Sequence, residues 1–230
     1  MMARSGVSST PDDRPRLDPG APLRRWLSPT WKFQLFGAPS FRLIAGVPRS
    51  RAKTFAEAVE ISALLVGIML LAGVLEMFVP ALRAFGIWPR HLWGLIGIVF
   101  SPLLHASMAH LAANTAPLFV LLTLLFWDKH YYPVRTLAMV WLASGCGTWL
   151  IGRSDAVHIG ASSIIYGLVT YLVVAGVLLR SWRSVVVAVL VLAAYGGIIY
   201  GALPQRGPVS WEGHFSGALA GVWAARSNHL

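Results

Sequence analysis

The chain has 230 residues, of which 56% are hydrophobic and 12% are charged, and its formal net charge is +10. So apolar and charge-poor a composition excludes an ordinary soluble domain. The basic residues border apolar segments, which favours anionic lipid headgroups over nucleic acid as their partner. The single cysteine, Cys146, excludes an intrachain disulfide and a cysteine-based zinc site.

The first 54 residues hold ten of the nineteen Lys and Arg residues. The region begins with a polar, proline-rich stretch rather than with the apolar core of a signal peptide. We therefore expect residues 1–54 to form a basic cytoplasmic tail that is largely disordered or interfacial. Residues 31–47 mix aromatic residues with Lys32 and Arg42, which indicates either a segment on the membrane surface or a linker.

Six apolar runs of about 20 residues predict an all-α, polytopic membrane domain over residues 55–225, followed by a short tail at 226–230. The predicted spans are 57–79, 104–127, 134–152, 159–179, 184–203 and 209–225. Between the first two spans, residues 80–103 contain Trp88, Trp93 and only short apolar pieces. Tryptophan prefers the membrane interface, so we expect a membrane-lying loop there.

The distribution of basic residues predicts the orientation. With six spans, one side of the membrane receives fifteen Lys and Arg residues and the other receives four. The positive-inside rule places both termini in the cytoplasm of a multi-pass protein, for which a bacterial plasma membrane is the expected location. The second, fourth and sixth spans then enter from the outer face. The polar residues near their starts share one depth; they are His105, His110, Asn114, Ser162 and His214.

Polar side chains within apolar spans are costly and indicate a functional site. A serine hydroxyl becomes a good nucleophile when a base removes its proton, and imidazole titrates near neutral pH. We therefore pair Ser162 as nucleophile with His214 as base. Small-residue steps at Gly213, Gly217 and Gly221 allow the two helices to approach closely.

Attack on a carbonyl builds negative charge on oxygen, which requires donors positioned in advance. His110 and Asn114, one helical turn apart, are candidate donors together with the Ser162 backbone N–H. Tyr166 lies one turn after Ser162 and is expected to pack beneath the imidazole. Glu212 is not assigned as a partner of His214, because it lies off the same helix face, so a Ser–His dyad is predicted.

These motifs resemble the rhomboid family of intramembrane serine proteases over residues 55–225. The pattern His-x4-His-x3-Asn appears at His105, His110 and Asn114, and the serine motif Gly-x-Ser appears at Gly160 and Ser162. The last pattern, His followed by Gly-x-x-x-Gly, appears at His214, Gly217 and Gly221. Each pattern alone is weak, but together they occur in family order.

The resemblance implies a six-helix bundle with a water-filled cavity open to the outside. It implies an intramembrane serine endopeptidase that needs no metal or cofactor and that cleaves transmembrane segments of single-span or multi-span membrane proteins. It assigns Ser162 and His214 to catalysis and His110 and Asn114 to the oxyanion site. Two departures stand out: Ser163 replaces the usual glycine, and Pro89 separates Trp88 from Arg90, which puts the usual anchoring of the first loop in question.

Other functions remain to be weighed. A non-proteolytic rhomboid-like binder of membrane-protein clients is the main alternative, although such a protein would normally lack the serine or the last histidine. A haem-binding bundle is a second alternative; it would show a Soret band in the purified protein, and we expect none. A transporter is disfavoured because no internal repeat is evident. His105 is expected to support the site rather than to catalyse. His158, just before the serine motif, is either a solvated loop residue or part of the site.

Overall fold

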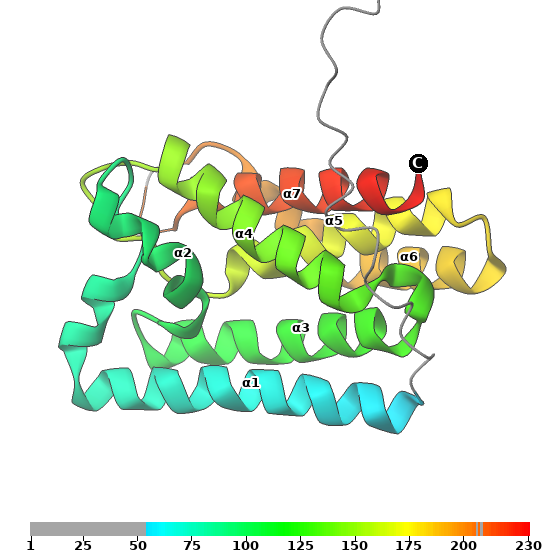
Figure 1. Ribbon diagram of the computed structural model, residues 1–230, viewed down its shortest axis with the longest axis horizontal. Coiled ribbons are helices and arrows are strands. Elements are labelled where there is room, and N and C mark those ends of the chain that lie inside the picture. Colours follow the sequence, from blue (N-terminus) through cyan, green and yellow to red (C-terminus); the bar gives the residue numbers. More distant parts are fainter. Residues whose placement is uncertain (1–53, 206, 208) are drawn as a thin grey trace, which may run out of the picture. The chain divides into compact units, whose positions relative to one another are not determined.

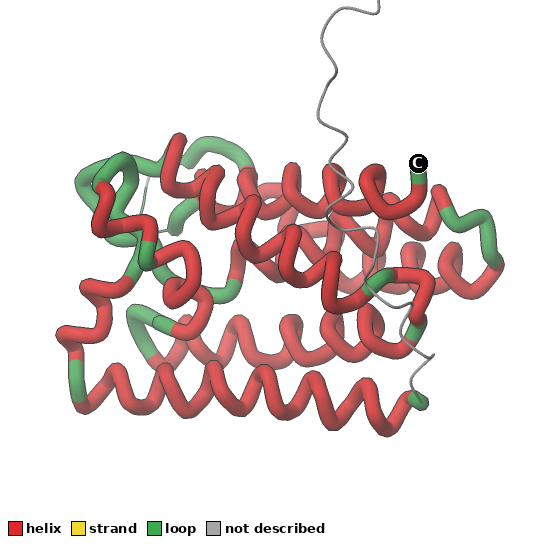
Figure 2. The backbone as a smooth tube through the Cα atoms, viewed as in Figure 1, coloured by secondary structure: helices red, strands yellow, loops and turns green. Residues whose placement is uncertain are grey.

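The computed structural model describes residues 54–205, 207 and 209–230, and the predicted tail at 1–54 therefore lies almost wholly outside the described residues. Figures 1 and 2 show a bundle of long helices in this part of the chain. The helices in chain order are α1 (Phe55–Phe78), α2 (Gly97–Phe100), α3 (Met108–Trp127), α4 (Pro133–Ile151), α5 (Ser162–Leu178), α6 (Trp182–Tyr195) and α7 (Trp211–His229). The described residues contain no strand, which confirms the all-α prediction.

Side-chain caps explain where several helices begin. Thr54 and Glu57 form a capping box that starts α1, and Ser107 accepts a hydrogen bond from the His110 backbone N–H at the start of α3. The predicted span 104–127 had implied that His105 lies within this helix. In the structure His105 precedes α3, which begins at Met108. At the other end of the chain, α7 continues to His229, beyond the predicted end at residue 225.

The short helix α5 occupies the centre of the bundle. It packs against α3, α4, α6 and α7, and most of its side chains are buried. Helix α1 packs mainly on α3 and, like α6, exposes many large apolar side chains. Within the described residues, four helical stretches are long and apolar enough to cross a membrane: Phe55–Phe78, Met108–Trp127, Lys129–Ile151 and Trp182–Ala202. Exposed apolar faces on such helices suit a lipid surrounding.

Helices α5 and α7 approach each other through glycine. A Cβ atom added at Gly217 would collide with the Ser163 carbonyl, and one added at Gly221 would collide with the Gly167 carbonyl. Only glycine allows two backbones to come this close. These contacts bring the first turn of α5 beside the first turns of α7.

The segment between α1 and α3 folds into short helical pieces, namely 3-10 turns at Pro80–Phe85, Leu92–Leu95 and Ser101–Leu103 together with α2. Arg90 anchors it, because its guanidinium donates to the carbonyls of Leu150 and Gly152 at 3.0 and 2.7 Å. Cationic side chains at a helix C-terminus satisfy carbonyls that the helix leaves unpaired. Arg90 therefore fixes this segment to the end of α4 even though Pro89 separates it from Trp88.

A buried carboxylate holds the same segment to α1. Glu76 is fully buried, and its Oε1 atom accepts from the Arg83 Nε at 2.7 Å while its Oε2 atom accepts from the His105 backbone N–H at 2.6 Å. Arg83 also donates to the Ala106 carbonyl at 3.1 Å. Buried charges need such complete pairing. The ion pair thereby positions the residues that lead into α3.

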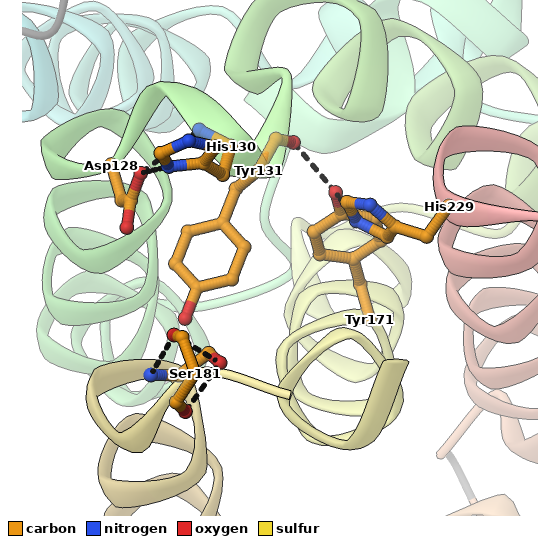
Figure 3. A network of polar contacts seen from close by, with 7 residues as sticks. Asp128, His130, Tyr131, Tyr171, Ser181 and His229 are labelled. Atoms are coloured by element: carbon orange, nitrogen blue, oxygen red, sulfur yellow. Dashed lines mark hydrogen bonds and ion pairs between the residues drawn. The ribbon is translucent and has the colours of Figure 1, made fainter. Parts of the chain in front are cut away.

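A polar cluster lies near the C-terminal end of α7, and Figure 3 shows three of its residues, Tyr131, Tyr171 and His229. The Tyr171 hydroxyl donates to the Tyr131 carbonyl at 2.6 Å and lies 3.2 Å from the His229 Nε2 atom. Asn228 donates to the Thr136 hydroxyl at 2.8 Å and to the Tyr171 hydroxyl at 3.3 Å. We call these five residues the Tyr171 cluster. It fastens the last turn of α7 to α5 and to the start of α4.

Candidate active site

The structure brings Ser162 and His214 together. Ser162 is the first residue of α5 and His214 lies in the first turn of α7. The His214 Nε2 atom is 2.9 Å from the Ser162 Oγ atom, which is hydrogen-bonding distance. Two residues that are 52 positions apart in sequence are thus joined at the same end of the bundle.

A backbone carbonyl determines which nitrogen of His214 carries the proton. The Nδ1 atom lies 2.9 Å from the Gly201 carbonyl oxygen, in the 3-10 turn Gly196–Ala202 that follows α6. A carbonyl only accepts hydrogen bonds, so Nδ1 is protonated and Nε2 has a free lone pair. That lone pair faces the Ser162 hydroxyl, as a general base requires. Nothing in the sequence pattern signalled Gly201.

Tyr166 packs against the imidazole as expected. Its ring is stacked on the His214 ring, with centroids 4.1 Å apart and planes inclined by 11°. A Cβ atom added at Gly201 would collide with the Tyr166 hydroxyl, so the three residues are tightly packed. Stacking restricts rotation of the imidazole and keeps its ring plane aligned with Ser162.

Both predicted oxyanion residues line the same cavity as Ser162 and His214. This cavity has a volume of about 770 Å³ and is lined mainly by apolar surface. The Asn114 amide donates to the His110 carbonyl one turn earlier at 2.9 Å, which uses one of its two N–H groups. Gly160 has φ +117°, and a Cβ atom there would lie 2.6 Å from the His110 ring. Glycine at this position therefore lets the turn before Ser162 pass close to His110.

His105 lies behind His110 rather than in the cavity lining. Its side chain is only 1% exposed, and its ring meets the His110 ring edge-on at 5.0 Å. Burial lowers the pKa of His105 to about 4, and the neighbouring His110 contributes to that shift. The imidazole packs against His110 without lining the cavity, and the supporting role expected for His105 stays a prediction.

His158 is buried, which excludes a solvated loop residue. It lies in the connection between α4 and α5, and its backbone pairs in both directions with Ile87. Its Nδ1 atom is 2.6 Å from the Ser210 Oγ atom, and its Nε2 atom is 3.1 Å from the Arg153 carbonyl. Glu212 is also buried, but no hydrogen bond within the described residues joins it to His214.

The sequence pattern of the Rhomboid domain matches residues 89–228, which include every predicted site residue. The chain belongs to the rhomboid family. Rhomboid proteins are generally intramembrane serine proteases that act on membrane proteins within the bilayer. The membership and the long apolar helices together make this chain an integral membrane protein with an all-α rhomboid-like bundle.

Similar proteins occur in mycobacteria. This rhomboid chain is 46% identical over 148 residues to the uncharacterized protein Rv1337 of Mycobacterium tuberculosis, covering 61% of this chain and 62% of the relative. It is 42% identical over 140 residues to the uncharacterized protein ML1171 of Mycobacterium leprae, covering 57% of this chain and 55% of the relative. The match thus spans somewhat more than half the length of these relatives.

Proposed function

We propose that this rhomboid is an intramembrane serine endopeptidase that hydrolyses transmembrane segments of membrane proteins with a Ser–His dyad. The observation that carries the proposal is the 2.9 Å contact between His214 Nε2 and Ser162 Oγ, with Nδ1 engaged by the Gly201 carbonyl. This arrangement leaves Nε2 as the only imidazole atom able to take the serine proton.

In the proposed reaction, Nε2 of His214 removes the Ser162 proton while Oγ attacks the carbonyl carbon of the substrate peptide. The carbonyl oxygen becomes an oxyanion, stabilised by the free Asn114 N–H, by His110 and by the Ser162 backbone N–H. The imidazolium then gives its proton to the leaving amine, and an acyl-enzyme remains on Oγ. A water molecule, deprotonated by His214, hydrolyses that ester and regenerates the hydroxyl.

The cavity suits an unwound transmembrane segment. Polar atoms of Ser162 and His214 face it, whereas Pro117, Ile165 and Ile198 give it apolar walls. Apolar walls accept the side chains of a membrane segment, and the polar atoms take up backbone groups that its helix releases. From the asymmetry of basic residues we propose that both termini are cytoplasmic and that cleavage occurs near the outer face of a bacterial plasma membrane.

A fluorophosphonate probe tests the nucleophile directly, because it forms a covalent bond only with an activated serine. The 230-residue chain in detergent should be labelled, and Ser162→Ala should not be. Ser163→Ala is the matched control, since it removes the neighbouring hydroxyl and should keep the label. The same three proteins should be assayed for cleavage of a reconstituted single-span substrate, where Ser162→Ala should lose on the order of 10⁵-fold in rate.

Equal labelling of the wild type and Ser162→Ala would reject Ser162 as the nucleophile. Absence of both labelling and cleavage in the folded wild type, with retention of a membrane protein on an affinity column, would instead support the alternative of a non-proteolytic client binder.

A further inference from the structure

His158 occupies a junction of three segments at the Ser162 end of the bundle. Its backbone N–H donates to the Ile87 carbonyl at 3.0 Å and its carbonyl accepts from the Ile87 N–H at 2.9 Å, which ties it to the segment after α1. Its side chain reaches Ser210, directly before α7. Figure 1 shows the end of α4, the start of α7 and the α1–α3 segment gathered at this end.

The hydrogen bonds of His158 define its tautomer. The Arg153 carbonyl, 3.1 Å from Nε2, can only accept, so Nε2 carries the proton. Nδ1 is then an acceptor, and the Ser210 hydroxyl donates a hydrogen bond to it at 2.6 Å. Burial lowers the pKa of His158, and the positive charge of Arg153 acts in the same direction. The Arg153 carbonyl, Glu212 and Asp155 raise the pKa but do not outweigh burial, so the neutral form of His158 is favoured.

Ser210 in turn determines where α7 begins. Its Oγ atom accepts from the Gly213 N–H at 3.2 Å, and its carbonyl accepts from the His214 N–H at 3.2 Å. A serine N-cap of this kind sets the position of the first helical turn. Because the Ser210 hydroxyl donates to His158 and accepts from Gly213, its rotamer is held from both sides.

We infer that His158 is a positioning residue that sets the spacing of Ser162 and His214 through Ser210. His158 stands four residues before Ser162, and Ser210 stands four residues before His214. The bond between them therefore joins the two short segments that deliver the nucleophile and the base. The Arg153 guanidinium adds a second link across the same gap, since it donates to the Val209 carbonyl at 3.4 Å.

The kinetic part of the test rests on the proposed function. His158→Phe keeps a ring of similar size but loses both side-chain hydrogen bonds. We expect kcat for a reconstituted substrate to fall roughly 10- to 100-fold with KM changed less than about threefold, because small misplacements of reacting groups are costly. His158→Asn keeps a polar atom near the Nδ1 position and should recover most of the rate. Ser210→Ala should match His158→Phe, and the double variant should be no slower than either.

Asn228→Ala serves as the stability control, because it loosens α7 at its other end without touching this junction. It should lower the melting temperature while leaving kcat unchanged. The inference would be overturned by a wild-type kcat in His158→Phe, or by an equal loss of kcat in Asn228→Ala. It would also be overturned if the loss of kcat in the double variant equalled the product of the losses in the two single variants.

A second measurement does not depend on catalysis. Hydrogen exchange should be faster in His158→Phe than in the wild type for peptides covering the first turn of α7, with little change over residues 218–229. If the wild type proves inactive, the proposed function fails, and this comparison alone decides the inference. Unchanged exchange at the start of α7 would reject it.

Discussion

The bundle carries a cluster of polar side chains at each end, and the two are built differently. At the Ser162 end, the His214 Nε2 atom lies 2.9 Å from the Ser162 hydroxyl, and both side chains line an open cavity. At the other end, the Tyr171 cluster uses its hydrogen bonds to join helices, and Tyr171 itself is fully buried. Similar residue types thus border a cavity at one end, where we propose catalysis, and join helices at the other.

The sharpest way to test this contrast is to remove the base. His214→Ala should reduce the cleavage rate on the order of 10⁵-fold, because Ser162 would lose its proton acceptor, and the double variant with Ser162→Ala should be no slower. Single-turnover cleavage of a reconstituted substrate measures this effect. A rate for the double variant far below either single variant would mean that the two residues do not act as a unit.

Asn114→Ala probes the oxyanion site and should cost roughly 10²-fold in kcat, as expected for loss of one donor. Thr115→Val is its matched control, since the Thr115 hydroxyl donates to the Leu111 carbonyl of its own helix. Steady-state kinetics should leave Thr115→Val near the wild-type rate. An unchanged kcat in Asn114→Ala would remove Asn114 from the site.

Two glycine variants compare positions along the same helix contact. Gly217→Ala and Gly221→Ala should each destabilise the protein by about 1–3 kcal/mol, because the new methyl group meets a backbone carbonyl. Gly217→Ala should also slow cleavage by about tenfold, since it pushes on Ser163 beside the nucleophile. Thermal unfolding and cleavage rates measured together separate the effects. Equal activity losses in both variants would contradict this ordering.

At the other end of the bundle, Tyr171→Phe should lower stability by about 0.5–1.5 kcal/mol, because the Tyr131 carbonyl loses one of its two donors and keeps the Thr136 hydroxyl. The cleavage rate at a temperature well below unfolding should stay within about twofold of the wild type, since Tyr171 does not line the cavity. A large loss of activity without a loss of stability would break the contrast between the two clusters.

His130→Ala should have the smallest effect. His130 and Asp128 form an exposed pair at 2.7 Å, with side chains 64% and 35% exposed. Exposed ion pairs contribute little, so stability should change by less than about 0.5 kcal/mol. Thermal unfolding at two salt concentrations measures it, and a shift comparable to that of Tyr171→Phe would contradict the expectation.

The sequence predicted six apolar helical segments, which correspond to α1 and α3 to α7, and it placed His105, His110, Asn114, Ser162 and His214 at one depth. Hydrophobic run length and motif spacing carry that information. The partner of His214 was beyond reach, because Gly201 contributes only a backbone carbonyl, which every residue possesses. The ion pair of Glu76 and Arg83 was missed although it had a signal: an acidic residue near the end of an apolar span, followed seven residues later by a basic one.

The end of α7 shows a different limit. Residues 226–229 read as a polar tail, yet Asn228 and His229 lie in the last helical turn and bond to Thr136 and Tyr171. Polar residues at the end of a chain are solvent-exposed only when the fold offers no polar group with which they can form hydrogen bonds. Partners brought together from α4 and α5 are a tertiary property, which a linear pattern does not contain.

His214 is held by the neutral Gly201 carbonyl rather than by an acidic side chain, and this has an energetic consequence in an apolar bundle. A carboxylate beside the imidazole would be a permanent charge in a medium of low permittivity. It would need an opposite charge or several hydrogen bonds to stabilise it, even without substrate. With Gly201 in that role, the resting dyad is uncharged. Under the proposed mechanism, opposite charges arise together on the imidazole and on the substrate oxygen, and they vanish together when the tetrahedral species collapses.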